Sequence, residues 1–379
     1  MRIGHLQLKN YRNYKDLSID LGTGLNIFIG NNAQGKSNIL ESIFICSLGK
    51  SYMNIKDQYL IKDGEEFASI KADFSTGDVE KQLEVIITEH AKKLKFNKIE
   101  VKKYCDYISN VKVLIFSPYN VNFIKDGPNV RRKSINMVIS QFSNNYVKLL
   151  QNYNAVLKKR NQFLKSIDCF KEYNRFYFDA LNERFCALAV DVVLERSKFV
   201  EKINQVLSQI YYEITDYENL EFKYISNIEI IDDKKQMLEQ CKLKVSSMFD
   251  REKAYGMTLI GPHRDDFSFL LDGSELSIYG SQGQIRAAIL ALKLAELLIF
   301  KEKDGEYPIL LLDDIFSELD IDKRNKLVKY ILDDVQTIIT TTDIDLIDKS
   351  LVDKAKIFVV ENGIIVEDGK KECKDELQN

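Results

Sequence analysis

The sequence has few of the residues on which metal centres and disulfide frameworks depend. It contains three histidines and six cysteines among 379 residues, and no two cysteines form a CxxC pair. Scattered cysteines are typical of a protein from a reducing compartment, and the histidines include no HExxH pair. We therefore expect neither a disulfide-stabilised fold nor a zinc site built from histidines or closely spaced cysteines.

Long apolar segments and a charge excess are also missing. The longest apolar runs, such as residues 309–312, fall far short of the roughly 20 residues that a membrane-spanning helix needs. No export leader is visible in the first residues, so a cytoplasmic protein without a membrane partner is expected. With 54 Lys+Arg against 57 Asp+Glu the net charge is −3, which excludes a wholly basic surface. Any nucleic-acid binding must then come from a local patch.

The composition is that of a folded protein. Hydrophobic residues make up 45% and charged residues 29% of the chain, a balance that allows a buried core and a solvated surface. A length of 379 residues suggests two or three domains, or one large domain that carries an insertion.

The spacing of apolar residues indicates how the chain is organised. Alternation over residues 3–29 and 67–116 predicts short strands, and helical spacing over 37–48 predicts a helix between them. From about 127 to 212 apolar residues recur every three or four positions. This pattern predicts two long helices that reverse near residues 166–170.

The last third of the chain returns to an α/β pattern after a further helix. The expected elements are a helix over 234–255, a strand at 257–260, a hairpin around 272–273, a helix over 282–303, strands at 309–312 and 337–340, and a hairpin at 362–363. The simplest architecture is an α/β head made from residues 1–126 and 252–379, with a helical arm of residues 127–251 inserted between them.

Residues 30–37 match the phosphate-binding pattern G-x-x-x-x-G-K-S, between a predicted strand and a predicted helix. Glycines let backbone N–H groups face phosphate oxygens, and the helix N-terminus adds the positive end of its dipole. Lys36 is expected to bridge the β- and γ-phosphates, and the Ser37 hydroxyl to hold Mg²⁺. The residues expected to bind the nucleotide are Gly30, Asn31, Asn32, Ala33, Gln34, Gly35, Lys36, Ser37 and Asn38. The alternative is a glycine turn with a chance lysine.

Two carboxylates, Asp313 and Asp314, follow the apolar strand 309–312. Asp313 is expected to lie in the coordination shell of Mg²⁺, and Asp314 to orient or deprotonate the attacking water. With Lys36 they form the predicted catalytic set. The alternative is a pair of surface carboxylates that cap a strand.

A third motif, at residues 281–286, opens the long helix 282–303. Ser281 and Gln284 have the spacing of a capping box, which explains both residues without a ligand. A capped helix N-terminus beside Gly283 is also a phosphate-binding feature. The order of the three motifs, followed by Ser317-Glu318-Leu319-Asp320, is that of ABC-type ATPase heads: Walker A, a long insertion, signature, Walker B and D-loop. In such heads the signature closes over the nucleotide of a second subunit.

Longer strings make the chain resemble the RecF family of bacterial DNA replication and repair proteins, over nearly its whole length. The matching strings are Leu8-Lys9-Asn10-Tyr11-Arg12-Asn13-Tyr14, Ile115-Phe116-Ser117-Pro118, Asp126-Gly127-Pro128, Arg131-Arg132, Gly261-Pro262-His263-Arg264-Asp265-Asp266, Gly280-Ser281-Gln282-Gly283-Gln284 and Leu312-Asp313-Asp314-Ile315-Phe316-Ser317-Glu318-Leu319-Asp320.

The resemblance implies a slow, DNA-stimulated ATPase that forms a homodimer on binding ATP with Mg²⁺. It implies binding to duplex and gapped DNA, cooperation with RecR and RecO in loading RecA, and a place at the nucleoid. Arg12 would lie near the phosphates, and Ser281, Gly283 and Gln284 would contact the nucleotide of the other subunit. Thr341-Thr342-Asp343 stands where many ABC heads have a histidine, and Thr342 or Asp343 would meet the γ-phosphate. For His263 and Arg264 a structural role and a role in catalysis or DNA contact both stay open.

Two basic clusters are candidates for contact with the DNA backbone: Arg131, Arg132 and Lys133, and residues 158–160. The alternative for each cluster is a solvated helix face. Two other classes of protein remain as alternatives, a nucleotide-binding subunit of an ABC transporter and a DNA-bridging ATPase of the SMC type.

Overall fold

The computed structural model describes residues 1–379 except 54, 167–171, 329, 331–333 and 368–379. The chain forms two compact units, each assembled from separate stretches of sequence. The first unit contains residues 1–122, 210–217 and 286–379, and the second contains residues 123–209 and 218–285. An α/β head split in the sequence by a largely helical insertion is therefore confirmed.

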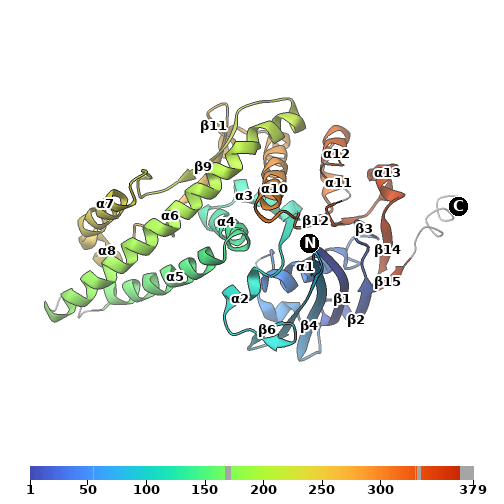
Figure 1. Cartoon of the computed structure of the whole chain (residues 1–379), viewed down its shortest axis with the longest axis horizontal. Helices are drawn as coiled ribbons and strands as arrows, with labels where there is room; N and C mark the ends of the chain where they lie inside the picture. The colour runs from blue at the N-terminus through green and yellow to red at the C-terminus, as the bar shows by residue number, and fades with distance from the viewer. Residues whose placement is uncertain (54, 167–171, 329, 331–333, 368–379) are drawn as a thin grey trace. The chain divides into compact units, whose positions relative to one another are not determined.

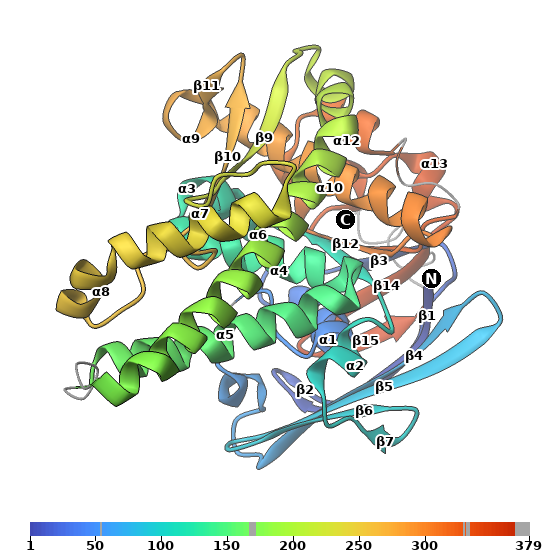
Figure 2. The same ribbon diagram turned by 60° about the vertical axis from the view of Figure 1, so that its left-hand side comes forward.

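An antiparallel sheet of six strands begins the first unit. Its strands lie in the order β2 (Tyr14–Asp20), β1 (Arg2–Tyr11), β4 (Phe67–Thr76), β5 (Val79–Thr88), β6 (Lys92–Phe96) and β7 (Ile99–Glu100) (Figure 2). Alternate residues of β4 (Ala68, Ile70, Ala72) are fully buried, and their neighbours are partly exposed. One face of the sheet is therefore apolar, and helix α1 (Lys36–Leu48) contacts β4 and β5.

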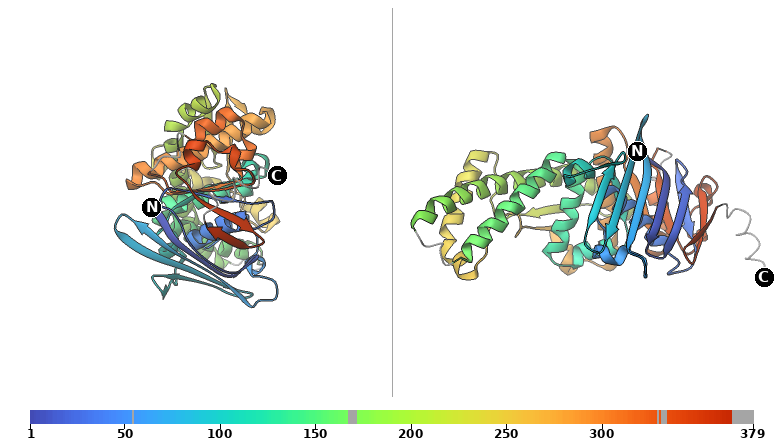
Figure 3. Two further views of the ribbon diagram at one scale, coloured as in Figure 1. Left: turned by 90° about the vertical axis from the view of Figure 1, so that its right-hand side faces the viewer. Right: turned by 90° about the horizontal axis from the view of Figure 1, so that it is seen from below.

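A second six-stranded sheet completes the core of this unit. Its order is β15 (Ile364–Glu367), β14 (Lys356–Glu361), β3 (Leu25–Ile29), β13 (Thr337–Thr341), β12 (Ile309–Asp313) and β8 (Val113–Phe116). All neighbouring pairs are parallel except β14 and β15. Helix α1 also contacts β13, β12 and β8, so it lies between the two sheets (Figure 3). Because β3, β13 and β12 run parallel, the carboxyl ends of β3 and β12 lie at the same edge of the sheet, where α/β folds bind their ligands.

The second unit is built on long helices and a small sheet. Helices α5 (Asn144–Leu164) and α6 (Glu172–Thr215) lie side by side (Figure 1 and Figure 2), and the rings of Phe163 and Phe178 stack at 4.8 Å. Strands β11 (Ser274–Glu275), β10 (Asp266–Leu271) and β9 (Leu220–Ile225) form an antiparallel sheet in that order. Helix α4 (Pro128–Phe142) contacts β10.

Further helices connect or cover these elements. They are η1 (Asp57–Leu60), α2 (Tyr104–Ile108), η2 (Pro118–Val121), α3 (Asn122–Lys125), α7 (Lys234–Ser247), α8 (Phe249–Tyr255), α9 (Leu276–Tyr279), α10 (Gln282–Asp304), α11 (Ile315–Glu318), α12 (Ile321–Val328), η4 (Ile344–Leu346) and α13 (Lys349–Val352). Within the described residues, none of the helices is both long and apolar enough to cross a bilayer.

Most predicted elements are present, with three differences. The first predicted arm helix is interrupted at Ser143, which has an extended backbone and accepts a hydrogen bond from the Tyr146 N–H as the N-cap of α5. The helix predicted over 234–255 divides at Met248. The strand predicted at 257–260 is wrong, because that segment is irregular. The predicted reversal at 166–170 lies mostly outside the described residues.

The boundary between head and arm also differs from the sequence interpretation. Residues 252–285, which the apolar pattern assigns to the head, belong to the second unit together with the long helices. The reason is pairing across the sequence: β10 is hydrogen-bonded to β9, from Asp266 opposite Ile225 to Leu271 opposite Leu220. The motif at residues 281–284 is thus part of the unit that carries the arm.

A buried polar cluster joins the helices of the second unit. Arg160 is fully buried and donates to the Asn182 side chain at 2.8 Å, to the Thr258 hydroxyl at 2.7 Å and to the Glu252 carboxylate at 2.5 Å. Burying a guanidinium costs much free energy unless its donors are satisfied in this way. Arg160 is therefore a structural residue, and its proposed contact with DNA is wrong.

Candidate nucleotide site

The loop of residues 30–35 lies at the carboxyl end of β3 and leads into α1. A Cβ atom on Gly30 would come within 2.3 Å of the Val360 carbonyl oxygen, and one on Gly35 within 2.4 Å of the Asn13 side chain. Gly35 also has a φ of 112°, which residues with a side chain rarely adopt. Both glycines of the motif are therefore required by the local packing as well as by the turn.

Lys36 is the first residue of α1, and its ammonium lies inside the loop. Its Nζ atom donates to the carbonyl oxygens of Gly30 at 2.7 Å and Asn31 at 2.8 Å, and the residue is only 6% exposed. Burial lowers the pKa of Lys36, whereas the nearby carboxylates of Asp314 and Asp313 act to raise it. The cation is thus held where an anionic ligand on the loop would meet it.

Ser37 and Asp313, which are 276 positions apart in the sequence, are in direct contact. The Ser37 hydroxyl donates to Asp313 Oδ1 at 2.7 Å, and the Thr340 hydroxyl donates to the same oxygen at 2.8 Å. The Tyr52 hydroxyl donates to Asp313 Oδ2 at 3.0 Å. The structure therefore brings together the two residues predicted to hold Mg²⁺.

Asp314 is presented by an unusual backbone conformation. Its φ is 51°, and its N–H donates to the Thr340 carbonyl oxygen at 3.1 Å and to the Thr340 hydroxyl at 3.0 Å. The residue directly precedes helix α11 and is partly exposed. Left-handed backbone at a residue with a side chain is strained, and such strain is concentrated at functional positions. That Asp314 orients or deprotonates the attacking water stays a prediction.

Two hairpins support the loop of residues 30–35 from the outside. No role in the site was predicted from the sequence for either hairpin. The Asn13 amide, in the β1–β2 turn, donates to the Gln34 carbonyl oxygen at 3.0 Å, and the Tyr14 hydroxyl donates to the Gly35 carbonyl oxygen at 3.1 Å. The backbone N–H groups of Asn362 and Gly363, in the β14–β15 turn, donate to the side chain and the carbonyl oxygen of Gln34. The Asn362-Gly363 hairpin signal marks one of these supports.

Arg12 lies beside this region, but it is paired inside the protein. Its guanidinium forms a two-pronged ion pair with the fully buried Glu41 carboxylate, with N–O distances of 3.0 to 3.1 Å. Glu41 is on α1, one turn beyond Ser37, and also accepts from the Tyr11 hydroxyl at 2.8 Å. The predicted contact of Arg12 with nucleotide phosphates stays a prediction.

The predicted signature is an exposed helix N-terminus in the second unit. The Ser281 N–H donates to the Gln284 side chain at 2.8 Å, and the Gln284 N–H donates to the Ser281 hydroxyl at 3.2 Å. The capping box is thus present, and Ser281 and Gly283 are exposed to solvent. Thr342, in the first unit, follows β13 directly and is half-buried. Whether these residues bind nucleotide stays a prediction.

The basic cluster at the start of α4 is largely engaged within the second unit. Arg131 forms an ion pair with Asp266, with N–O distances of 2.6 and 2.8 Å, and Arg132 donates to the Asp265 carbonyl oxygen at 2.5 Å. Lys133 is exposed. These hydrogen bonds give the two arginines a structural role, and contact of the cluster with DNA stays a prediction.

The segment 261–266 is part of a buried network. His263 Nδ1 lies 2.6 Å from the Tyr153 hydroxyl, and Nε2 lies 3.0 Å from the Thr258 carbonyl oxygen, so the neutral ring accepts from one and donates to the other. Arg196 donates to the Pro262 carbonyl oxygen at 2.7 Å. Burial, with nearby arginines, lowers the pKa of His263 to about 4. The geometry gives His263 a structural role.

Replacement of His263 should change how stability depends on pH. The unfolded histidine titrates near pH 6.5, and the folded one near 4, so the unfolded state takes up a proton first as pH falls. Between pH 7.5 and pH 5 the wild type should lose roughly 2 kcal/mol of stability that the His263→Gln variant retains. Glutamine keeps one acceptor and one donor. Urea unfolding at both pH values measures the difference.

His90 provides the matched control, because its side chain is 88% exposed. The His90→Gln variant should follow the wild type at both pH values. An equal loss of stability in the wild type and in His263→Gln would show that His263 does not contribute to acid sensitivity.

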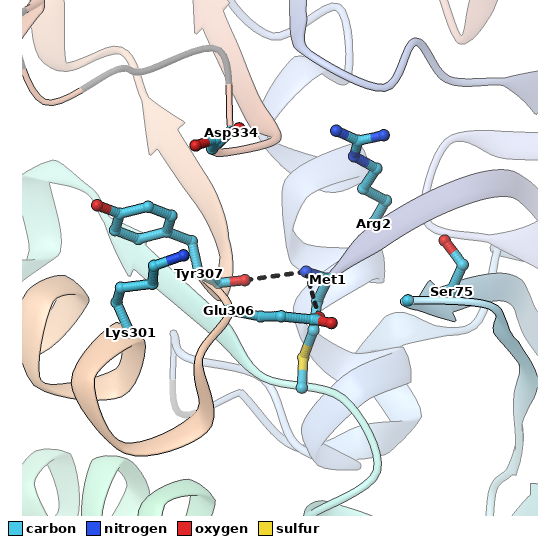
Figure 4. A pocket seen from close by; sticks show the side chains of 8 residues that line it. Met1, Arg2, Ser75, Lys301, Glu306, Tyr307 and Asp334 are labelled. Atoms are coloured by element: carbon cyan, nitrogen blue, oxygen red, sulfur yellow. Dashed lines mark hydrogen bonds and ion pairs between the residues drawn. The ribbon is translucent and has the colours of Figure 1, made fainter.

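A cavity of about 310 Å³ lies elsewhere in the first unit, near the start of β12 (Figure 4). Its lining residues are Met1, Arg2, Ser75, Gly77, Lys301, Glu306, Tyr307 and Asp334. The amino group of Met1 donates to the Glu306 carboxylate and to the Tyr307 carbonyl oxygen, both at 3.1 Å. The cavity contains none of the residues predicted to bind the nucleotide, which gather at the opposite end of β12.

The loop between β3 and α1 surrounds the Lys36 ammonium, and Ser37 at the start of α1 contacts Asp313 at the end of β12. These features define a P-loop ATPase head. The family model described as RecF/RecN/SMC N terminal domain matches residues 2–366. The DNA replication and repair protein RecF of Staphylococcus carnosus (strain TM300) is 36% identical over 369 residues, covering 97% of this chain and 100% of that protein.

Two further relatives agree. The DNA replication and repair protein RecF of Ligilactobacillus salivarius (strain UCC118) is 35% identical and covers 99% of this chain and 100% of that protein. The solved structure of the recombination mediator protein RecF with ATP, in the RecFOR pathway, has a TM-score of 0.90 at 31% identity, with 97% of each chain covered. The chain belongs to the RecF family.

Proposed function

We propose that this chain binds ATP with Mg²⁺ on residues 30–38 and uses it as a switch in DNA repair. The observation that carries the proposal is the contact of Ser37 with Asp313 at 2.7 Å, beside the buried ammonium of Lys36. A cation, a hydroxyl and a carboxylate at the N-terminus of one helix are the groups that a nucleoside triphosphate and its metal require. The similar RecF structure with ATP supports the choice of nucleotide.

The residues present fit Mg²⁺. A hydroxyl and a carboxylate are oxygen ligands, and Mg²⁺ is usually held by one or two protein oxygens together with phosphates and water. Among the residues that the structure describes, no group of three or more His, Cys, Asp or Glu side chains could hold a metal by itself, which agrees with a site completed by the nucleotide. When bound, the ion would neutralise charge on the phosphates.

Hydrolysis is assigned to Asp314. This carboxylate would orient or deprotonate the attacking water, while Lys36 stabilises the negative charge on the phosphates. Asp314 stands where transporter ATPases usually have glutamate, whose side chain is one methylene longer. The shorter reach agrees with the slow hydrolysis that a switch needs. We assign Arg12 and Thr342 to the surroundings of the phosphates.

ATP would act through dimerisation. In this proposal Ser281, Gly283 and Gln284 of one subunit close over the γ-phosphate bound to a second copy of the chain, and hydrolysis releases the pair. The exposure of Ser281 and Gly283 at a capped helix N-terminus supports this role. The closed dimer would hold duplex DNA at gaps, with Lys133 among its backbone contacts. RecR would be a direct partner, and RecO and RecA would act downstream.

The proposal is tested by DNA binding with ATP, with ADP and without nucleotide, across a salt series. We expect ATP to tighten binding to duplex and gapped DNA and the affinity to fall steeply as salt increases, because backbone contacts release counterions. Equal affinity in the three nucleotide states would contradict an ATP switch. Binding that does not depend on salt would contradict contacts with the DNA backbone.

A further inference from the structure

Tyr52, which belongs to none of the sequence motifs, contacts the carboxylate at the centre of the site. Its hydroxyl donates to Asp313 Oδ2 at 3.0 Å, whereas Ser37 and Thr340 both donate to Oδ1. Asp313 is 3% exposed, so little water is available to hold its second oxygen. Rotation about the Cβ–Cγ bond of Asp313 would move both oxygens, so the donor on Oδ2 adds a third restraint to the two on Oδ1.

The position of the Tyr52 ring is fixed by its neighbours. The ring lies 5.4 Å from that of Phe44 on α1, in an edge-to-face arrangement, and 6.3 Å from that of Tyr119. The preceding residue, Ser51, donates its hydroxyl to the Glu41 carboxylate at 2.5 Å and accepts from the Met53 N–H at 3.0 Å. The segment is thus anchored on the helix that begins with Lys36 and Ser37.

We propose that Tyr52 is a positioning residue for the Mg²⁺ site. By holding Oδ2 it keeps Oδ1 of Asp313 directed at the Ser37 hydroxyl, so that both metal-binding groups are placed before the ion arrives. Residues that orient a metal ligand in this way change metal affinity by roughly 10- to 100-fold when they are replaced. The inference rests on the proposed function, because it assumes that Mg²⁺ binds at Ser37 and Asp313.

The Tyr52→Phe variant removes the hydroxyl and keeps the ring. The matched control is Tyr104→Phe, whose hydroxyl donates to the Leu48 carbonyl oxygen at 2.7 Å, at the other end of α1. Each protein is loaded with a non-hydrolysable ATP analogue, and Mn²⁺ binding is measured by electron paramagnetic resonance. Affinity for the analogue is measured separately in EDTA, and thermal unfolding is followed without ligands.

We expect Tyr52→Phe to bind Mn²⁺ about 10-fold more weakly than the wild type, with Tyr104→Phe within about 2-fold of it. Affinity in EDTA and the unfolding temperature should be alike in the two variants. Unchanged Mn²⁺ affinity in Tyr52→Phe would overturn the inference, and so would an equal loss of analogue affinity in EDTA, which would make Tyr52 a support of the loop. Failure of the wild type to bind Mn²⁺ with the analogue would instead overturn the proposed Mg²⁺ site.

Discussion

Replacing Ser281 with arginine should abolish ATP-dependent dimerisation while leaving ATP binding by the single chain intact. Ser281 is exposed and accepts the Gln284 N–H, so the substitution removes an N-cap and places a long cationic side chain where the second subunit would have to approach. Loss of the cap alone costs about 1 kcal/mol, which the fold should tolerate. Sedimentation with and without ATP measures the dimer, and titration with a fluorescent ATP analogue measures binding.

The control for this variant is Ser247→Arg, which introduces the same side chain at an exposed position of α7 in the same unit. It should dimerise with ATP as the wild type does, and ATP hydrolysis should fall in Ser281→Arg alone. If Ser281→Arg still forms dimers with ATP in the same proportion as the wild type, the signature does not act across subunits and the proposed switch fails.

Replacing Lys36 with methionine should weaken ATP binding by about 100-fold or more. The ammonium now satisfied by Gly30 and Asn31 carbonyl oxygens would otherwise meet phosphate oxygens, and each charge-assisted hydrogen bond contributes roughly 1.5–3 kcal/mol. The fold should persist, because burial already disfavours the charged lysine and lowers its pKa. Calorimetric titration with ATP and Mg²⁺ measures the loss of affinity.

Lys92→Met is the matched control. Its Nζ atom also donates to a backbone carbonyl oxygen, that of Gly49 at 2.8 Å, but at the opposite end of α1. ATP should raise the unfolding temperature of the wild type and of Lys92→Met, and raise that of Lys36→Met much less. An ATP-induced rise in Lys36→Met equal to that of the wild type would rule out residues 30–38 as the nucleotide site.

Local features of the site were predictable from the sequence because each depends on neighbours in the chain. The glycines, Lys36 and Ser37 fall within eight consecutive residues, 30–37, which lead from a strand into the first turn of a helix. The structure has that strand and that helix as β3 and α1. The capping box of Ser281 and Gln284 is present with both of its hydrogen bonds. In each case a single turn of backbone determines the geometry.

Contacts between distant parts of the chain were not predictable in the same way. Tyr52 meets Asp313 across 261 positions, and Asn13 meets Gln34 through the packing of a hairpin on the loop. No spacing rule connects such residues, since the pairing depends on how sheets and helices are arranged in space. The assignment of residues 252–285 to the second unit has the same origin, in the pairing of β10 with β9.

The sequence by itself determined the kind of chemistry: a phosphate-binding loop, a pair of acidic residues after an apolar strand, and a helical insertion between two halves of a head. Such features are encoded by residue type and short-range periodicity. Only the tertiary structure decided which side chains complete the site. It pairs Arg12 with Glu41, buries Arg160 and places Tyr52 on the second oxygen of Asp313. These pairings follow from burial, because a charged or polar group removed from water needs a hydrogen-bonding partner. The tertiary fold determines which partner lies within reach.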